Sequence, residues 1–205
     1  VSIFSCVEEL RVWGYRVEIV IVSNMSDDWT PDILKQRYEQ WINRGRLKVV
    51  VWNDRPGLDV SRNKGVEAAS GELIVLCDAH CSIMIGALHG LIQGWCRHGG
   101  MWFPSVNCWT DWDDCRLRAY NLGLTHNFWG TQSFDVPPWA IKDGKIGVYT
   151  IPMASHAVGL IDKKTFQDVH GFHPDFRTYA GGESYLNMKL WLLGIKSWIN
   201  PDSLV

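Results

Sequence analysis

The sequence contains no apolar stretch of about 18 residues, the length from which a membrane-spanning helix is predicted. Its N-terminus has no basic region followed by an apolar core and small residues, so it does not resemble a secretory signal peptide. No internal repeat, low-complexity tract or linker interrupts it. These absences predict one folded domain over residues 1–205, without a membrane span and in the cytoplasm.

Charge excess and paired cysteines are also missing. The net charge of −2 provides no global basic field of the kind that attracts nucleic acid. It does not exclude a local basic groove. The six cysteines include no C-x-x-C pair, which favours free thiols in a reducing compartment over a disulfide framework or a zinc knuckle. The 46% hydrophobic and 20% charged content is that of an ordinary globular protein with a sizeable core.

Short apolar runs alternate with helical patterns along the first half of the chain. Alternation of this kind is typical of an α/β fold with a mostly parallel sheet, in which ligands bind at the carboxyl ends of the strands. Thr30 and Pro31 predict the N-cap and the first residue of a helix. Strands are predicted at 1–4, 17–22, 47–52 and 72–77, and helices at 6–13, 31–43, 60–70 and 84–96.

The second half of the chain is less regular. Residues 107–139 are rich in Trp, Asn and Asp with little periodicity, which predicts a long excursion over the binding edge of the sheet. Strands are predicted at 148–153 and 157–161, and helices at 163–169 and 183–194.

Polar residues follow two of the predicted strands. Asp78 and His80 come after the apolar run "ELIVLC", and residues i and i+2 of a strand share one face. A carboxylate and an imidazole in one space can share a metal ion, or they can form a plain hydrogen-bonded pair. The polar stretch "SNMSDD" (23–28) follows another strand, so both clusters are predicted to meet at one sheet edge.

Two blocks of sequence resemble the GT-A glycosyltransferases, and above all the polypeptide N-acetylgalactosaminyltransferases. "NDRPGLDVSRNKGVEAASGELIVLCDAHC" (53–81) ends in Asp-x-His, where most GT-A relatives have Asp-x-Asp. "AVGLIDKKTFQDVHGFHPDFRTYAGGESYLNMKLWLLG" (157–194) contains the Gly-Gly-Glu that leads a helix in that family. The resemblance implies a single GT-A, Rossmann-like domain, with a nucleotide-sugar-binding half at 1–106 and an acceptor-side half at 107–205.

The resemblance also implies a bound divalent cation. Asp78 and His80 would hold Mn²⁺, or another divalent ion, against the diphosphate of a UDP-sugar. Mn²⁺ accepts mixed carboxylate and imidazole ligands, whereas Mg²⁺ and Ca²⁺ favour sets made only of oxygen. Such an ion stabilises the negative charge that accumulates on a diphosphate leaving group.

Four residues match positions that contact the nucleotide in the family. Arg55 and Arg62 are implied to face it, since an arginine fork suits phosphate, although a solvated surface arginine is the alternative for each. Ser23 and Asn24 stand where relatives carry paired acidic residues. Asn24 can both donate to and accept from a uracil edge.

The resemblance assigns the sugar and the catalytic group to the second block. Glu183 matches the active-site glutamate, and Gly182 before it permits a close backbone approach to a ligand. The alternative for Glu183 is a carboxylate favoured by the helix dipole. His156 and Ala157 match positions that line the sugar pocket, where relatives prefer glycine. Ser184 follows Glu183 where inverting relatives have Asp, which favours retention of configuration.

The sequence therefore predicts a metal-dependent glycosyltransferase with Glu183 and Asp78 as catalytic residues. The donor is a nucleotide-sugar, UDP-linked by the resemblance, and the acceptor hydroxyl can belong to a protein, a glycan or a hydroxylated base in nucleic acid. Two other functions are compatible with the sequence: nucleotidyl transfer at a similar sheet edge, and sugar-nucleotide binding without turnover.

Overall fold

The computed structural model describes residues 3–24, 26–52, 54, 57–108, 118–120, 124–126, 132–134, 140–154, 156–176 and 181–205. Arg55 and most of the excursion predicted at 107–139 lie outside these ranges. None of the described helices is long and apolar enough to cross a membrane.

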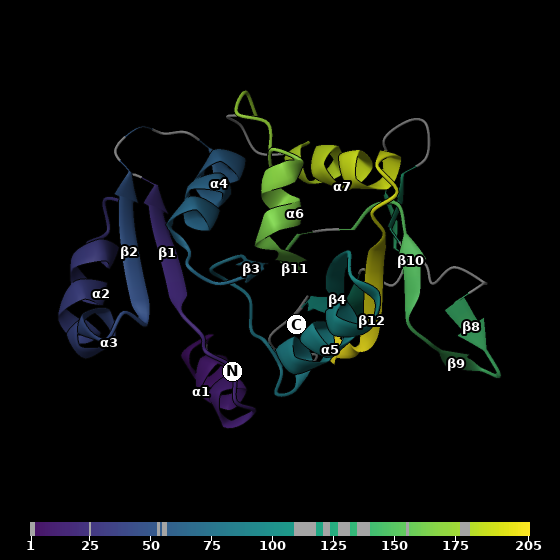
Figure 1. Ribbon diagram of the computed structural model, residues 1–205, viewed down its shortest axis with the longest axis horizontal. Coiled ribbons are helices and arrows are strands. Elements are labelled where there is room, and N and C mark those ends of the chain that lie inside the picture. The colour runs from purple at the N-terminus through teal and green to yellow at the C-terminus, as the bar shows by residue number, and fades with distance from the viewer. Residues whose placement is uncertain are drawn as a thin grey trace.

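The strands form two main sheets (Figure 1). The smaller sheet pairs β1 (Ile19–Asn24) and β2 (Leu47–Trp52) in parallel, so that both strands end at the same edge. The larger sheet has the order β10-β12-β4-β11-β3, and β5 (Arg118–Tyr120) continues it from the end of β4. Its other strands are β3 (Leu73–Cys77), β4 (Met101–Cys108), β10 (Tyr149–Ile151), β11 (Val158–Asp162) and β12 (Ser197–Leu204). Two hairpins stand apart, namely β6 (Leu124–His126) with β7 (Gln132–Phe134) and β8 (Ile141–Lys142) with β9 (Lys145–Ile146).

The larger sheet is mixed. β4 and β12 are parallel, whereas β11 runs antiparallel to both β3 and β4, and β10 runs antiparallel to β12. The parallel pairing expected from the alternating pattern therefore holds for β1 with β2 and for β4 with β12. The antiparallel insertion of β11 places its first residue, Val158, beside Cys77 at the end of β3.

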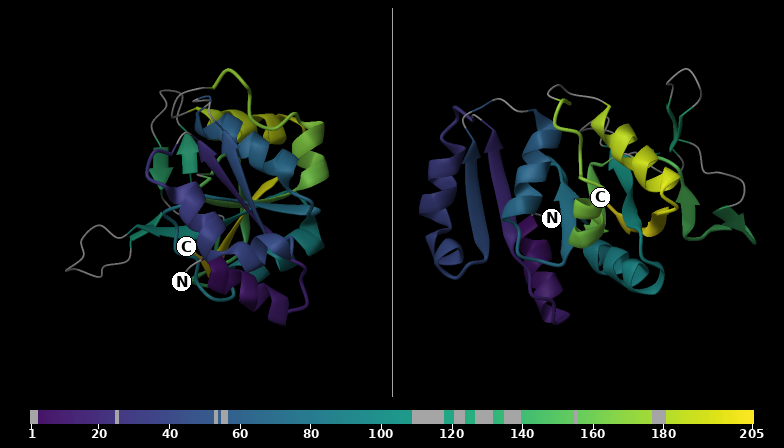
Figure 2. Two further views of the ribbon diagram at one scale, coloured as in Figure 1. Left: turned by 90° about the vertical axis from the view of Figure 1, so that its left-hand side faces the viewer. Right: turned by 45° about the horizontal axis from the view of Figure 1, so that its top comes forward.

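Helices cover both faces of the larger sheet (Figures 1 and 2). The side chains alternate along β4, because Met101 and Phe103 pack into one cluster and Trp102 packs into the other. The first cluster contains residues of α4 (Leu58–Ala68), α6 (Lys163–Asp168) and α7 (Gly182–Leu192). The second contains residues of α1 (Ile3–Val12) and α5 (Ala87–His98). α2 (Thr30–Arg37) and α3 (Glu39–Asn43) pack against β2.

The start of the chain differs from the sequence prediction. Residues 1–4 were expected to form a strand, but a helix is already present at Ile3. Helical geometry buries Cys6, Val7 and Leu10 together, and it stacks Phe4 on Tyr38 at 4.2 Å between ring centroids. Tertiary burial on one helical face therefore overrides the short apolar run.

Two predicted helix boundaries are also corrected. The helix expected at 31–43 is interrupted at Tyr38, which separates α2 from α3. Thr30 is the first residue of α2 and not its N-cap. That position belongs to Trp29, whose φ of 60° is left-handed, and Asp28 Oδ1 accepts a hydrogen bond from Thr30 N at 3.1 Å. The local Asp28 turn therefore replaces the expected threonine cap.

Candidate functional site

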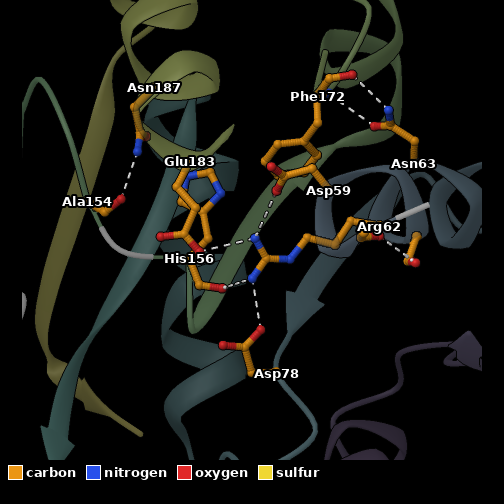
Figure 3. Close-up of polar contacts among 11 residues, drawn as sticks. Asp59, Arg62, Asn63, Asp78, Ala154, His156, Phe172, Glu183 and Asn187 are labelled. Carbon is orange, nitrogen blue, oxygen red and sulfur yellow. Dashed lines mark hydrogen bonds and ion pairs between the residues drawn. The ribbon is translucent and has the colours of Figure 1, made fainter. Parts of the chain in front are cut away.

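Side chains from both halves of the chain meet around Arg62 on α4 (Figure 3). Its Nη2 donates to Asp78 Oδ1 at 2.8 Å and to the main-chain oxygen of His156 at 3.2 Å. Its Nη1 donates to Glu183 Oε1 at 3.1 Å and lies 3.7 Å from Asp59 Oδ1. The side chain is only 8% exposed. One guanidinium thus joins the end of β3 to the start of α7.

The Arg62 side chain is buried, so it is not the solvated surface arginine that was the alternative to a nucleotide contact. Both terminal nitrogens already serve carboxylates, and the guanidinium carbon lies 5.6 Å from the centre of the Phe172 ring. A direct phosphate contact stays a prediction, and it requires Arg62 to release one of its carboxylates. The nucleotide contact predicted for Arg55 lies outside the described residues.

The cluster carries more negative than positive charge. Asp59, Asp78 and Glu183 surround a single arginine. Burial raises the pKa of Asp59, with Arg62 opposing and Glu183 adding to that rise. Unbalanced carboxylates in a partly buried site favour binding of a cation.

Close packing explains the glycine before Glu183. A Cβ atom at Gly182 would lie 1.7 Å from Asp59 Oδ2, so no other residue fits between α7 and α4 without a shift. Gly181, just before α7, has a φ of 98°, which also favours glycine. The pair brings the first turn of α7 against Asp59, and Glu183 follows with its side chain 33% exposed. The predicted close approach of Gly182 is thus made to Asp59 in this structure.

Asp78 and His80 follow β3 in a turn and do not share a strand face. β3 ends at Cys77, and Asp78 O accepts from Cys81 N at 3.2 Å. The main chain of Asp78 is held by β11, because Asp78 N donates to Ala157 O at 2.9 Å. The premise that strand geometry aligns the two side chains is therefore wrong, although both lie at the same turn.

The donor set of this turn suits a divalent cation in part. Asp78 has a side chain 23% exposed, and His80 is exposed, so a carboxylate oxygen and an imidazole nitrogen can both be reached from solvent. Within the described ranges, no group of three His, Cys, Asp or Glu side chains is arranged to hold a metal ion. The described protein thus supplies two candidate ligands next to an excess of carboxylates.

Ser23 and Asn24 end β1 with unpaired polar atoms. Ser23 is 4% exposed, and its Oγ and the Oδ1 of Asn24 are buried without a hydrogen-bond partner in the part of the chain that is described. Buried polar atoms are normally paired. The two atoms therefore suit a polar ligand group at the position predicted for the nucleotide base.

His156 contributes its main chain to the cluster. Its ring is 0% exposed, lies against Phe103 and Phe172, and forms no hydrogen bond of good geometry with other described residues. Burial lowers the pKa of His156 to about 4, so the ring is neutral near pH 7. A contact of His156 or Ala157 with a sugar stays a prediction; in this structure their carbonyl groups orient Arg62 and Asp78.

The sequence analysis missed residues that hold this arrangement together. Asp59 stands three positions before Arg62 on one helix, a spacing that could have signalled the pair. Asn63 joins α4 to the turn after α6, since it donates to Phe172 O at 2.8 Å and accepts from Phe172 N at 3.0 Å. No sequence signal pointed to that second link.

Comparison with known proteins identifies the fold. Residues 2–103 match the family model of glycosyl transferase family 2. The chain superposes on the crystal structure of GalNAc-T7 with UDP, GalNAc and Mn²⁺ with a TM-score of 0.76, at 19% identity, over 94% of this chain and 38% of that one. The chain has the GT-A fold, and its first half is similar to glycosyl transferase family 2. The GT-A fold class and the family resemblance predicted from the sequence are thereby confirmed.

Other relatives of this GT-A chain point the same way. It is 27% identical over 195 residues to polypeptide N-acetylgalactosaminyltransferase 5 of Caenorhabditis elegans. This alignment covers 91% of this chain and 31% of the relative. It also resembles the mannosyltransferase PcManGT from Pyrobaculum calidifontis in complex with GDP-Man and Mn²⁺, with a TM-score of 0.60 and 16% identity over 99% of this chain and 52% of that one. The chain thus spans about a third of the length of the curated relatives it matches.

Proposed function

We propose that this GT-A chain is a metal-dependent glycosyltransferase that transfers a sugar from a UDP-sugar to an acceptor hydroxyl, with retention of configuration. The observation that carries the proposal is the bridge from Asp78 through Arg62 to Glu183. It places the candidate metal ligand and the candidate active-site carboxylate on one guanidinium, at the edge of the sheet where ligands bind in α/β folds. The UDP and Mn²⁺ in the GalNAc-T7 structure support the choice of donor and metal.

Asp78 and His80 would hold the divalent cation. When bound, the ion acts as a Lewis acid that stabilises charge on the departing diphosphate. The protein prepares this position with three carboxylates around one arginine. The hydrogen bond from Asp78 N to Ala157 O keeps the Asp78 turn against β11.

Ser23 and Asn24 would receive the base of the donor. Their unpaired buried oxygens offer acceptors, and the Asn24 amide can also donate, which suits the mixed edge of uracil. Arg55, from the family resemblance, would face the diphosphate. Gly182 and the carbonyl groups of His156 and Ala157 would line the sugar position.

Glu183 would act on the sugar or on the acceptor. Arg62 holds one of its carboxylate oxygens, while the side chain stays 33% exposed at the start of α7. A carboxylate held in this way stabilises positive charge at an anomeric carbon. Because Ser184 and not Asp follows it, we propose retention. The acceptor would be a hydroxyl of a protein, of a glycan or of a hydroxylated base in nucleic acid.

A donor screen tests the function directly. UDP-, GDP- and dTDP-sugars are combined with Mn²⁺, and binding is read by thermal shift while free nucleotide and pyrophosphate are quantified. We expect a UDP-sugar to bind and to release UDP. Release of pyrophosphate would favour nucleotidyl transfer, and binding without turnover in the full-length protein would favour a binding module.

Asp78→Asn tests the metal site, because it keeps the side-chain shape and removes the charge. Turnover should fall by about 100-fold or more, and EDTA should abolish turnover of the unsubstituted protein. Asp175→Asn is the matched control, since Asp175 is an acidic side chain that is 83% exposed. Full activity of Asp78→Asn, or of the protein in EDTA, would contradict the metal requirement.

Glu183→Gln tests the catalytic carboxylate and the stereochemistry. UDP binding should stay nearly unchanged while turnover collapses, because the proposal assigns the nucleotide to the sequence block at 53–81. The anomeric coupling in the NMR spectrum of the product reports the configuration, and an α-linked donor should give an α-linked product. A β-linked product would overturn retention and would make Glu183 a candidate general base.

A further inference from the structure

Two cysteines flank the Asp78–His80 turn. Cys77 is the last residue of β3 and is exposed, and Cys81 is half-buried at the far end of the turn. Both converge on one main-chain oxygen: Cys77 Sγ donates to Asp78 O at 3.3 Å, and Cys81 N donates to the same atom at 3.2 Å. The turn therefore folds the two cysteines toward each other.

Both sulfur atoms donate to main-chain oxygens around the turn. Cys81 Sγ contacts Ala157 O at 3.5 Å, the oxygen that receives the hydrogen bond from Asp78 N. The sulfur atoms thus belong to the same short hydrogen-bond system that orients Asp78.

We infer that Cys77 and Cys81 form a reversible disulfide under oxidation, and that this bond weakens binding at the Asp78–His80 turn. The second part rests on the proposed function, in which that turn holds the metal and the nucleotide diphosphate. The bond requires a sulfur–sulfur separation of about 2.05 Å and a narrow range of torsion angles. Closing it replaces the thiol contacts with Asp78 O and Ala157 O, so the turn that carries both candidate ligands must adjust.

The chemistry needs a two-electron oxidant, such as a hydroperoxide. One cysteine attacks a peroxide oxygen as thiolate, which gives a sulfenic acid and, with hydrogen peroxide, one water molecule. The second sulfur attacks the sulfenic sulfur, the S–S bond forms and a second water molecule leaves. Both sulfur atoms together lose two electrons, which reduce the peroxide, and a dithiol reductant reverses the step.

Cys96 provides a matched control. It is also a free and exposed cysteine, but it lies on α5 and not at the turn. Cys6 is buried and donates to Ile83 O at 3.6 Å, so it is shielded from the oxidant. Oxidation at Cys96 reports general thiol reactivity, whereas a bond between Cys77 and Cys81 reports the geometry of the turn.

Peptide mapping tests the disulfide without any ligand. The protein is oxidised with hydrogen peroxide, blocked with iodoacetamide and digested with a protease that cleaves before aspartate, which separates Cys77 from Cys81 at Asp78. We expect the two peptides to stay joined in the unsubstituted protein and in Cys96→Ser, and to separate after dithiothreitol. They should be separate in Cys77→Ser and in Cys81→Ser. The inference would be overturned if Cys77 is oxidised while the two peptides stay separate. It would also be overturned if the peptides are joined only when Cys96 is present.

Mn²⁺ and UDP binding then test the consequence. Free Mn²⁺ is measured by electron paramagnetic resonance in the presence of UDP, with reduced and oxidised protein. Oxidation should weaken binding by about tenfold or more, the effect expected when groups that orient a metal ligand are disturbed. Cys77→Ser should bind equally before and after peroxide. Unchanged binding by protein that carries the disulfide would refute the consequence. Absence of binding by the reduced protein would instead contradict the proposed function, and peptide mapping would still decide the disulfide.

Discussion

The guanidinium of Arg62 lies 2.8 Å from the carboxylate of Asp78, the residue that the sequence marks as a metal ligand. The same side chain reaches Glu183 at 3.1 Å, 121 positions further along the chain. Asp78 therefore shares its charge between Arg62 and any cation that binds at the turn. The binding of any cation at this turn is therefore coupled to the stability of the fold through this arginine.

Arg62→Met should destabilise the protein in a pH-dependent way. Without the guanidinium, three carboxylates face one another with no cation between them, and nothing opposes the burial that already raises the folded-state pKa of Asp59. The variant should lose about 3–5 kcal/mol of unfolding free energy at pH 8, and the loss should shrink as the pH falls toward 5 because protonation relieves the repulsion. Urea denaturation at both pH values measures the difference.

The control for this variant lies on the same helix. Lys64 pairs with Glu67 at the surface, so Lys64→Met should change the unfolding free energy by about 0.5 kcal/mol or less at either pH. Equal losses for Arg62→Met at pH 5 and pH 8 would show that lost packing dominates. Added Mn²⁺ should raise the melting temperature of Arg62→Met more than that of the unsubstituted protein, because the ion replaces the missing charge.

Gly182→Ala should separate α7 from α4. The new methyl group overlaps Asp59 Oδ2, and overpacking of this kind costs about 1–3 kcal/mol. Turnover of the UDP-sugar should fall as well, since Glu183 is carried on the displaced turn. In the double variant with Asp59→Ala the overlap disappears, so the combined cost should be clearly smaller than the sum. Gly147→Ala is the control, because a Cβ there meets no atom within 4 Å. Strictly additive costs would argue against the contact.

Asn24→Ala should specifically weaken the binding of UDP. Loss of a buried base contact costs about 1–3 kcal/mol, which isothermal titration in Mn²⁺ would detect as weaker UDP binding. The unsubstituted protein should be stabilised more by UDP than by GDP. Asn43→Ala, at the exposed end of α3, should leave UDP affinity unchanged. Equal stabilisation by all nucleotides, unaltered in Asn24→Ala, would remove Asn24 from the base site.

His156 should make the fold sensitive to mild acid. Burial lowers its folded-state pKa to about 4, below the unfolded value, so the unfolded chain binds a proton first as the pH falls. Between pH 7.5 and pH 5 this linkage removes about 2 kcal/mol of stability. His156→Leu should remove that part of the pH dependence, as seen in denaturation curves. His173→Gln should keep it, because that ring is 44% exposed. The same slope in His156→Leu would assign the effect to other groups.

Much of the fold was predictable because its signals are local. The apolar run at 47–52 coincides with β2, and β3 ends one residue before Asp78, as the change from apolar to polar residues indicates. The helix at the start of the chain was missed, because a run of four residues cannot show the helical face that buries Val7 and Leu10. Local pattern also failed to predict the antiparallel β11, which lies between β3 and β4 in the sheet but follows both in the chain.

The sequence by itself determined which chemical groups are present and that Asp78, Ser23 and Asn24 lie near the ends of strands, since residue order and hydrophobic period are properties of short segments. Only the tertiary structure decided what these groups contact. Arg62 was expected to face the nucleotide, and only the tertiary structure shows that it binds Asp78 and Glu183, which are 16 and 121 positions away. The need for Gly182 arises from Asp59, a residue on another helix. Contacts of this kind depend on how separate elements pack. The spacing of residues along the chain does not encode the distance between side chains on different elements.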